Sequence, residues 1–323
     1  MSDTFSGKKL APEGYVYNTY GKKLYLKQAV ASVTTLRRYD KERPVALFCS
    51  IEHKEILQEN SLSNVFDHIY LLPDENASIP GFKHYVYKFM PFEKNLYLDG
   101  DIVWCRHPDF LWKSFSPYPF TITGNQISDV FFGSSKGIGI LNDILLFRRW
   151  RTLKRFNITY LSRVQSGMIY AADEEKTKEV CELAQLMLDK RHLTHFRSRK
   201  EESGRTEETC EWSLAMAMAK LKIQVYPWVF GYNSPQIDFI DSYTRYNEDF
   251  TEVRCLIYND RLTYNLRGLR LKPLRKILTR LFSLIPGKGD HLYATPFCLH
   301  FGWYHQKEPF NKFSRKVWKT LTS

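Results

Sequence analysis

The chain has 323 residues, 43% of them hydrophobic and 15% aromatic, which is enough apolar side chain to build a core and excludes a wholly disordered protein. Lysine and arginine number 47 against 35 aspartates and glutamates, and the net charge of +12 favours a phosphate-bearing partner such as a nucleotide, an anionic lipid or a nucleic acid. No apolar run reaches the roughly 18 residues of a membrane-spanning helix, which excludes such a span.

The first part of the chain alternates short apolar runs with amphipathic stretches. In chain order these are a β-rich segment at 15–20, apolar residues at helical spacing in 22–39, an apolar run at 44–50, a charged helical stretch at 52–60 and an apolar run at 68–72. Strands that alternate with helices are typical of an α/β fold with a mostly parallel, Rossmann-like sheet flanked by helices. We therefore expect this fold class.

Two aspartates come at the end of a predicted strand. A helix is predicted at 82–90, and the following run Asn-Leu-Tyr-Leu-Asp-Gly-Asp-Ile-Val-Trp at 95–104 contains Asp99 and Asp101. Ligands of open α/β sheets bind beyond the carboxyl ends of the strands, so both carboxylates point to the site. Such a pair suits Mn²⁺ or Mg²⁺ bound to the phosphates of a nucleotide, although Asp-Gly-Asp is also turn chemistry.

Two later segments complete the pattern of the α/β domain. Residues 164–170 read as a buried strand in which Gly167 allows a close backbone approach, and residues 211–221 read as a helix whose apolar stripe excludes Glu211. The polar stretch 198–209 between them is predicted to be a loop.

With these elements in place, the chain resembles the GT-A fold glycosyltransferases, particularly the family 8 type that includes glycogenin and lipopolysaccharide galactosyltransferases. The resemblance depends mainly on the Asp-Gly-Asp run and on the late sequence His300-Phe-Gly302, and it covers residues 14–250 and 296–310 in outline. In that family the D-x-D motif chelates Mn²⁺ bound to a nucleotide-sugar diphosphate, and the late histidine completes the metal site. The resemblance therefore implies a metal-dependent hexosyltransferase with a UDP-sugar donor and retention of configuration.

The resemblance also assigns roles to individual residues. It implies metal ligands at Asp99, Asp101 and His300, donor-binding residues at Tyr17, Asn18, Thr19, Lys83, Asp99, Gly302 and Lys307, and catalytic residues at Gln165 and Glu211. The chain departs from the family pattern at three places. Gly302 follows His300 by two residues instead of three, and Lys307 comes five residues after Gly302. Gln165 replaces the asparagine that is usual in the family. Glu211 is followed by a tryptophan, whereas the family has a glutamine after its acidic residue.

Each of these residues also has an ordinary structural explanation. A histidine beside aromatic residues is often a satisfied structural group, Lys83 can be a solvated charge, and Glu211 can be a first-turn acid that complements a helix dipole.

Two other functional classes remain open. A haloacid dehalogenase-like phosphatase would use Asp99 as nucleophile, but it needs the motif on its first strand. A non-enzymatic basic module would bind lipid or nucleic acid, but the strand-end carboxylates would repel those phosphates, and we expect no nucleic-acid partner.

The C-terminal part contains a basic amphipathic helix. At 273–285 the apolar residues fall on one helical face, while Arg275, Lys276 and Arg280 lie off it. This pattern predicts a helix that lies on an anionic membrane, with its basic side chains at the lipid headgroups. The alternative is that the apolar face packs against the rest of the protein. An enzyme held there would act on a lipid-linked acceptor, as in cell-surface polysaccharide assembly; any other glycan acceptor remains open.

We expect two parts in the chain. Residues 1–250 would form the nucleotide-sugar-binding catalytic domain, and residues 251–323 an extension that supplies the basic helix and returns His300 to the site. Six scattered cysteines without a C-x-x-C pair, and an N-terminus without the pattern of a secretory signal, predict a cytoplasmic protein, peripheral on the inner face of a membrane if the helix binds lipid.

Overall fold

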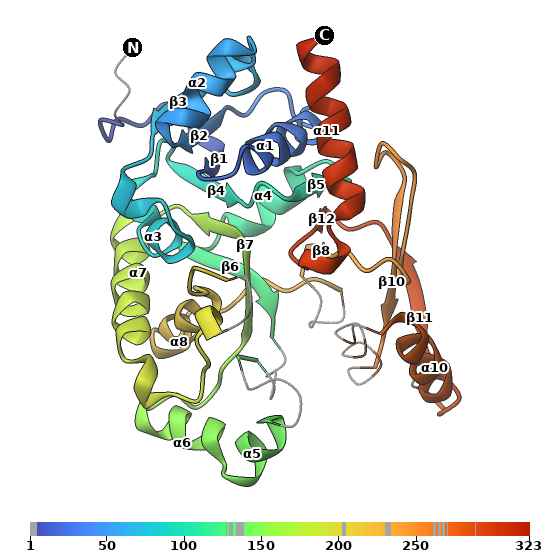
Figure 1. Ribbon diagram of the computed structural model, residues 1–323. Coiled ribbons are helices and arrows are strands. Elements are labelled where there is room, and N and C mark those ends of the chain that lie inside the picture. Colours follow the sequence, from blue (N-terminus) through green and yellow to red (C-terminus); the bar gives the residue numbers. More distant parts are fainter. Residues whose placement is uncertain are drawn as a thin grey trace.

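A six-stranded sheet runs through the computed structural model of the chain (Figure 1). Its strand order is β3-β2-β1-β4-β7-β6. The strands are β1 (Glu13–Thr19), β2 (Val45–Cys49), β3 (His68–Leu71), β4 (Lys94–Leu98), β6 (Phe120–Asn125) and β7 (Arg163–Ala171). Strands β3, β2, β1 and β4 are parallel to one another, and β7 runs antiparallel to both β4 and β6. The expected mostly parallel α/β sheet is therefore confirmed.

The structure describes most of the chain. The described residues are 5–126, 128, 132–133, 139–201, 205–229, 234–260, 263, 266, 269, 271–287 and 289–323. All six cysteines lie among them as free, buried thiols. Within these ranges, no helix is both long enough and apolar enough to cross a membrane.

Helices cover both faces of the sheet. One face carries α1 (Lys23–Leu36), α2 (Ile51–Glu59), α4 (Asp109–Phe115) and α11 (Glu308–Thr322), and the other carries α3 (Ile79–Lys83), α7 (Glu174–Asp189) and α8 (Glu211–Lys220). Because the inner strands of the sheet are buried between these helices, most of their residues are apolar on both sides, which explains the continuous apolar runs in the sequence, whereas the edge strand β3 is only partly buried. Two further helices, α5 (Gly139–Leu145) and α6 (Arg148–Arg155), belong to the connection between β6 and β7.

One predicted helix is wrong in its position. Instead of a helix at 82–90, the chain forms α3 at Ile79–Lys83 and a short 3-10 turn at Val86–Lys88. The helix starts early because the Ser78 side chain accepts a hydrogen bond from the Gly81 N–H and so caps it. The 3-10 turn that follows replaces the rest of the predicted helix.

Two small three-stranded sheets contain the remaining strands, including those near the end of the chain. One has the order β5-β12-β8 and the other β11-β10-β9. Their strands are β5 (Ile102–Trp104), β8 (Gln236–Asp238), β9 (Thr244–Tyr246), β10 (Val253–Tyr258), β11 (His291–Ala294) and β12 (Cys298–His300). Strand β12 lies between β5 and β8, antiparallel to the first and parallel to the second. A segment near residue 300 thus pairs directly with the strand that follows Asp101.

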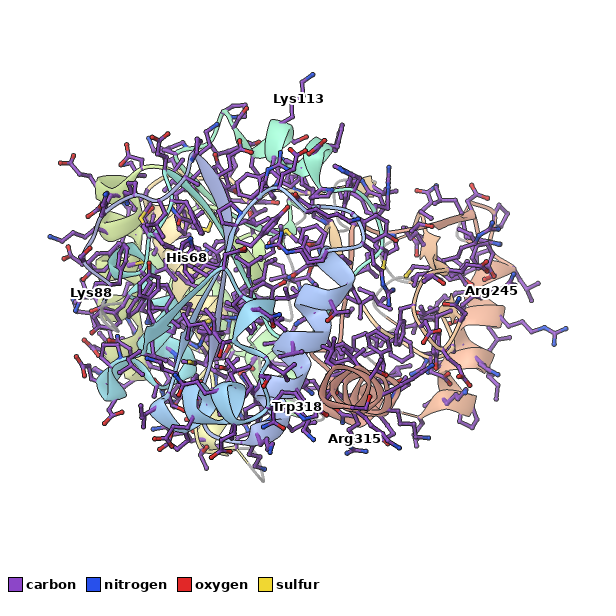
Figure 2. All side chains as sticks on the ribbon, turned by 90° about the horizontal axis from the view of Figure 1, so that it is seen from above. His68, Lys88, Lys113, Arg245, Arg315 and Trp318 are labelled. Atoms are coloured by element: carbon purple, nitrogen blue, oxygen red, sulfur yellow. The ribbon has the colours of Figure 1, made fainter. Side chains whose placement is uncertain are left out.

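The C-terminal helix α11 holds this returning segment in place. It lies beside α1, and the view from above shows Trp318 near their contact (Figure 2), where the Lys27 ammonium is 5.3 Å from the Trp318 ring centroid. The buried Phe310 ring of α11 stacks on Phe301, with 4.9 Å between the ring centroids. Phe301 directly follows His300, so this packing fixes the backbone at the end of β12.

The basic helix forms, but one of its cations faces inward. Helix α10 spans Lys272–Ser283, and Arg275 is only 1% exposed. Its guanidinium donates to Ser242 Oγ at 2.8 Å and to the Leu269 carbonyl at 2.8 Å. The expectation that Arg275 reaches lipid is therefore wrong. The helix packs through this hydrogen-bonded polar side and leaves its aliphatic side outward.

Replacement of Phe310 by alanine tests the role of α11 in stability. Since the ring is fully buried, Phe310→Ala should lower the free energy of unfolding by about 3–5 kcal/mol, measured by urea denaturation. Lys319→Ala, an exposed position on the same helix, serves as control and should stay within about 0.5 kcal/mol of the parent. Equal stabilities of the two variants would contradict the packing described.

Candidate functional site

The two aspartates of the Asp-Gly-Asp motif lie in the turn between β4 and β5. The Asp99 N–H donates to the Gly167 carbonyl at 3.0 Å, which ties the turn to β7. The Asp101 carbonyl accepts from the Phe301 N–H at 3.0 Å, which ties it to the chain after β12. The motif is therefore held on both sides by backbone hydrogen bonds at the carboxyl end of the central parallel strand.

His300 completes a compact group of possible metal ligands. One ligand atom from each of Asp99, Asp101 and His300 lies within 4.8 Å of the other two. The His300 Nε2 is 3.5 Å from Asp101 Oδ1 and 3.8 Å from Asp99 Oδ2. The structure thus brings together the three residues that the resemblance implied as metal ligands, from two segments about 200 positions apart in the sequence.

A further acid, Asp238, orients this histidine. It ends β8 directly opposite His300 in the β8–β12 register, and its Oδ1 lies 2.8 Å from His300 Nδ1. Because a carboxylate accepts, Nδ1 carries a proton and donates it, which leaves Nε2 facing Asp99 and Asp101. Sequence reasoning missed Asp238. Its only sequence signal is an acid three residues after Pro235, with a single apolar residue, Ile237, before it, and no spacing rule distinguishes such a segment from a surface loop.

Gly302 makes room for the imidazole. A Cβ atom at position 302 would come 2.6 Å from His300 Cε1, closer than carbon atoms approach without displacement. A side chain at position 302 would therefore displace the His300 ring. Gly302 contributes to the site by leaving space for that ring.

Each aspartate of the motif is paired with a lysine. Lys83 Nζ is 2.7 Å from Asp99 Oδ1 and donates to the Ser166 carbonyl at 2.9 Å. Lys307 Nζ is 2.6 Å from Asp101 Oδ2. Burial lowers the pKa of Lys83, but the Asp99 carboxylate outweighs it and the net pKa is raised, so this lysine stays charged.

The charges of Asp101 and His300 depend on each other. Burial alone would raise the pKa of Asp101, but Lys307 and His300 hold it well below its usual range. Burial alone would lower the pKa of His300, but Asp101 and Asp238 raise it well above its usual range. The imidazole therefore keeps a proton between carboxylates, and a cation ligated by Nε2 would displace that proton.

Gln165 and Glu211 lie on the β7 and α8 side of the group. Gln165 Nε2 donates to Asp238 Oδ2 at 3.3 Å, and Glu211 Oε1 accepts from the Ser166 N–H at 3.4 Å. Burial raises the pKa of Glu211, against the opposing effect of Arg163 and Lys83. Both expected catalytic residues are thus within the same cluster as the possible metal ligands.

The three expected donor residues on β1 have different surroundings. Asn18 lines a small cavity together with Lys83 and Asp99, so it belongs to the site. Tyr17 is fully buried on the other face of the strand, where its hydroxyl shares a 3.0 Å hydrogen bond with Ser32 Oγ, and the structure does not bring it to the site. Thr19 is 3% exposed at the end of β1.

Comparison with solved structures identifies the fold. The chain is similar to the galactosyltransferase LgtC in complex with donor and acceptor sugar analogues, with 10% sequence identity and a TM-score of 0.51 over 94% of this chain and 95% of that chain. An active-site mutant of LgtC matches over the same shares with a TM-score of 0.50 and 10% identity. The glycosyltransferase GlyE of Streptococcus pneumoniae TIGR4 matches at 13% identity and a TM-score of 0.48, over 98% of this chain and 62% of that chain. No protein-family model and no curated protein matches the chain.

At this identity the likeness to LgtC shows the fold, and the fold is the GT-A fold that the resemblance implied. Asp99 follows the central strand β4, not the first strand of the chain, so the haloacid dehalogenase-like alternative does not fit this topology.

Asp238→Asn tests the orientation of His300. The neutral amide oxygen accepts from Nδ1–H more weakly than a carboxylate and adds no negative charge, so Mn²⁺ affinity measured by titration calorimetry should fall by about 10- to 100-fold. Asp189→Asn, at an exposed position at the end of α7, is the matched control and should bind like the parent. Equal Mn²⁺ affinity for the two variants would show that Asp238 does not position the histidine.

Proposed function

We propose that this protein is a metal-dependent glycosyltransferase that transfers a hexose from a UDP-sugar to a glycan or lipid-linked acceptor with retention of configuration. The observation that supports this most strongly is the convergence of Asp99, Asp101 and His300 at the carboxyl end of β4 in a GT-A fold. LgtC, which shares this fold, was solved with donor and acceptor sugar analogues. We therefore propose that this chain also binds a sugar donor and a sugar acceptor.

The residues of the site fit a divalent cation. Two carboxylates and one imidazole, the latter fixed by Asp238, form a hard ligand set that suits Mn²⁺ or Mg²⁺. When bound, the cation supplies positive charge to the diphosphate of the donor.

The lysines act on the leaving group. As the bond between sugar and diphosphate breaks, negative charge grows on the diphosphate oxygens. Lys83 and Lys307, already held at the two aspartates by ion pairs, place two fixed ammonium groups beside that charge. They lower the barrier without forming a covalent bond to the donor. Asn18 and Thr19 at the end of β1 would hold the nucleoside, and the small cavity that Asn18 lines with Lys83 and Asp99 supports this role for Asn18.

Gln165 and Glu211 would contact the sugar. Glu211 Oε1 accepts from the Ser166 N–H, and Gln165, the residue before Ser166, donates to Asp238 Oδ2. In this position they orient the sugar, and the carboxylate offsets the positive charge that develops at the anomeric carbon. A basic binding module would need neither group, and it would turn over no nucleotide sugar.

Helix α10 supports a membrane-bound acceptor. Five aliphatic side chains on α10 and just after it are 42–76% exposed: Leu274, Ile277, Leu281, Leu284 and Ile285. Lys276 and Arg280 beside them are exposed as well. An aliphatic face flanked by cations suits an anionic lipid surface, and the protein would then act on a lipid-linked acceptor in cell-surface polysaccharide assembly.

Asp101→Asn tests the metal-dependent reaction. The change removes one carboxylate ligand, so UDP release from a panel of UDP-hexoses in the presence of Mn²⁺ should fall at least about a hundredfold. His300→Gln should act in the same direction and covers the case in which Asp101→Asn is poorly folded. Asp189→Asn should retain activity. Parent-like UDP release by both site variants, at a parent-like melting temperature, would end the metal hypothesis.

The membrane contact of α10 is tested by sedimentation with vesicles. Ile277→Asp/Leu281→Asp places two carboxylates on the exposed aliphatic face and should reduce binding to vesicles that contain phosphatidylglycerol. Binding of the parent should weaken as salt rises, because screening shortens the reach of Lys276 and Arg280. Parent-like binding by the double variant would show that α10 does not contact the membrane.

A further inference from the structure

A cavity of about 340 Å³ lies away from the candidate active site, between α6 and the segment 191–201. Five arginines line it: Arg148, Arg151, Arg155, Arg191 and Arg197. Among the described residues that line it, Glu201 is the only acid. The described lining of the cavity therefore carries an excess of positive charge.

Few of these charges are neutralised within the protein. Arg191 is 3.7 Å from Glu201, and Arg148 is 3.4 Å from Asp143. Arg155 donates to the Leu193 carbonyl, a contact that leaves its charge in place. In the part of the chain that the structure describes, Arg151 and Arg197 have no acidic partner. Repulsion among the guanidinium groups is a cost that a bound anion would remove.

One ring nitrogen of a buried histidine in the cavity wall has no hydrogen-bond partner among the described residues. His195 is 7% exposed, and its Nδ1 is 3.0 Å from Thr152 Oγ1. Its Nε2 has no hydrogen-bond partner among the described residues. Burial lowers the pKa of His195 to about 4, with Arg149 acting in the same direction, so the ring is neutral and adds no charge. A polar group of a ligand would satisfy a nitrogen that is costly to leave unpaired.

The surface beside the cavity is apolar. Six large side chains of α5, α6 and the turn between them are 44–72% exposed: Leu141, Ile144, Leu145, Leu146, Phe147 and Trp150. Water-facing surfaces rarely gather so many apolar groups in ten residues. Apolar side chains that border arginines are typical of a segment lying at the boundary between lipid headgroups and acyl chains.

The position of α5 and α6 relates this surface to the active site. Both helices belong to the connection from β6, which ends at Asn125, to β7, which starts at Arg163 and carries Gln165. They therefore extend from the end of the sheet at which Asp99 lies. Helices α5, α6 and α10 lie toward the same end of the molecule, the lower one in Figure 1.

We propose that the arginine-lined cavity binds the phosphate group of an anionic membrane lipid while residues 141–150 enter the adjacent interface. Arginine suits this ligand because its planar donors match phosphate oxygens in pairs. The charge and the apolar border occur together, which favours a lipid over a phosphate free in solution. Lipid binding at this cavity goes beyond sugar transfer and does not depend on it.

Vesicle sedimentation of the full chain in EDTA tests this site. Arg151→Gln/Arg197→Gln removes the two arginines without acidic partners, and affinity for phosphatidylcholine vesicles containing phosphatidylglycerol should fall roughly 30-fold. Lys113→Gln/Lys319→Gln is the charge-matched control. Both lysines are exposed, on α4 and α11, and Lys113 projects from the edge of the molecule (Figure 2), so this variant should change affinity less than about threefold. Leu145→Asn/Trp150→Gln should also weaken binding, because it removes apolar contact alone.

A soluble probe separates the two sources of phosphate. Glycerol 3-phosphate, titrated in EDTA, should bind weakly to the parent and to Leu145→Asn/Trp150→Gln, but not to Arg151→Gln/Arg197→Gln. Binding of glycerol 3-phosphate without any binding of anionic vesicles would overturn the lipid assignment in favour of a soluble phosphate. Equal vesicle affinity for the arginine variant and the lysine control would overturn the site itself.

Two further readouts keep this site distinct from the others. In the Ile277→Asp/Leu281→Asp background, the arginine variant should still lower vesicle affinity, which separates the cavity from α10. Without vesicles, Arg151→Gln/Arg197→Gln should release UDP from a UDP-sugar like the parent. An inactive parent that still binds anionic vesicles through these arginines would reject the transferase and retain the lipid site.

Discussion

The pairing of β12 between β5 and β8 is the constraint on which the candidate site depends. This pairing carries His300 to Asp101 on one side and to Asp238 on the other, although the three residues are far apart in the sequence. Helix α11 secures it by stacking Phe310 on Phe301. Without that return of the chain, the two aspartates of the turn would lack the third possible metal ligand, His300.

Charge balance explains why such a site can be buried. Asp99, Asp101 and Asp238 lie close together and would repel one another, and burial makes that repulsion expensive. Lys83, Lys307 and the proton on His300 compensate them in the structure described. The same arrangement fits the proposed cation and diphosphate: a cation bound by Nε2 would take the place of the His300 proton, and the two lysines would face the phosphate charge.

Sequence reasoning succeeded where a local pattern determines the structure. Asp99 and Asp101 follow a continuous apolar run, and such a run at the centre of an α/β pattern predicts a buried strand with its ligands at the end. The residues it missed depend on tertiary pairing. Asp238 becomes significant only because β8 lies beside β12, and the amphipathic pattern of 273–285 could not reveal that Arg275 turns inward to Ser242.

The melting temperature of the parent protein with Mn²⁺, with a UDP-sugar, and with both together tests the central claim most directly. Ligands that bind the folded state stabilise it by mass action. If Asp99, Asp101 and His300 hold the cation against the donor diphosphate, the correct UDP-sugar and Mn²⁺ together should raise the melting temperature by more than the sum of their separate effects. Shifts that are merely additive for every UDP-sugar, or absent, would contradict a metal-dependent donor site.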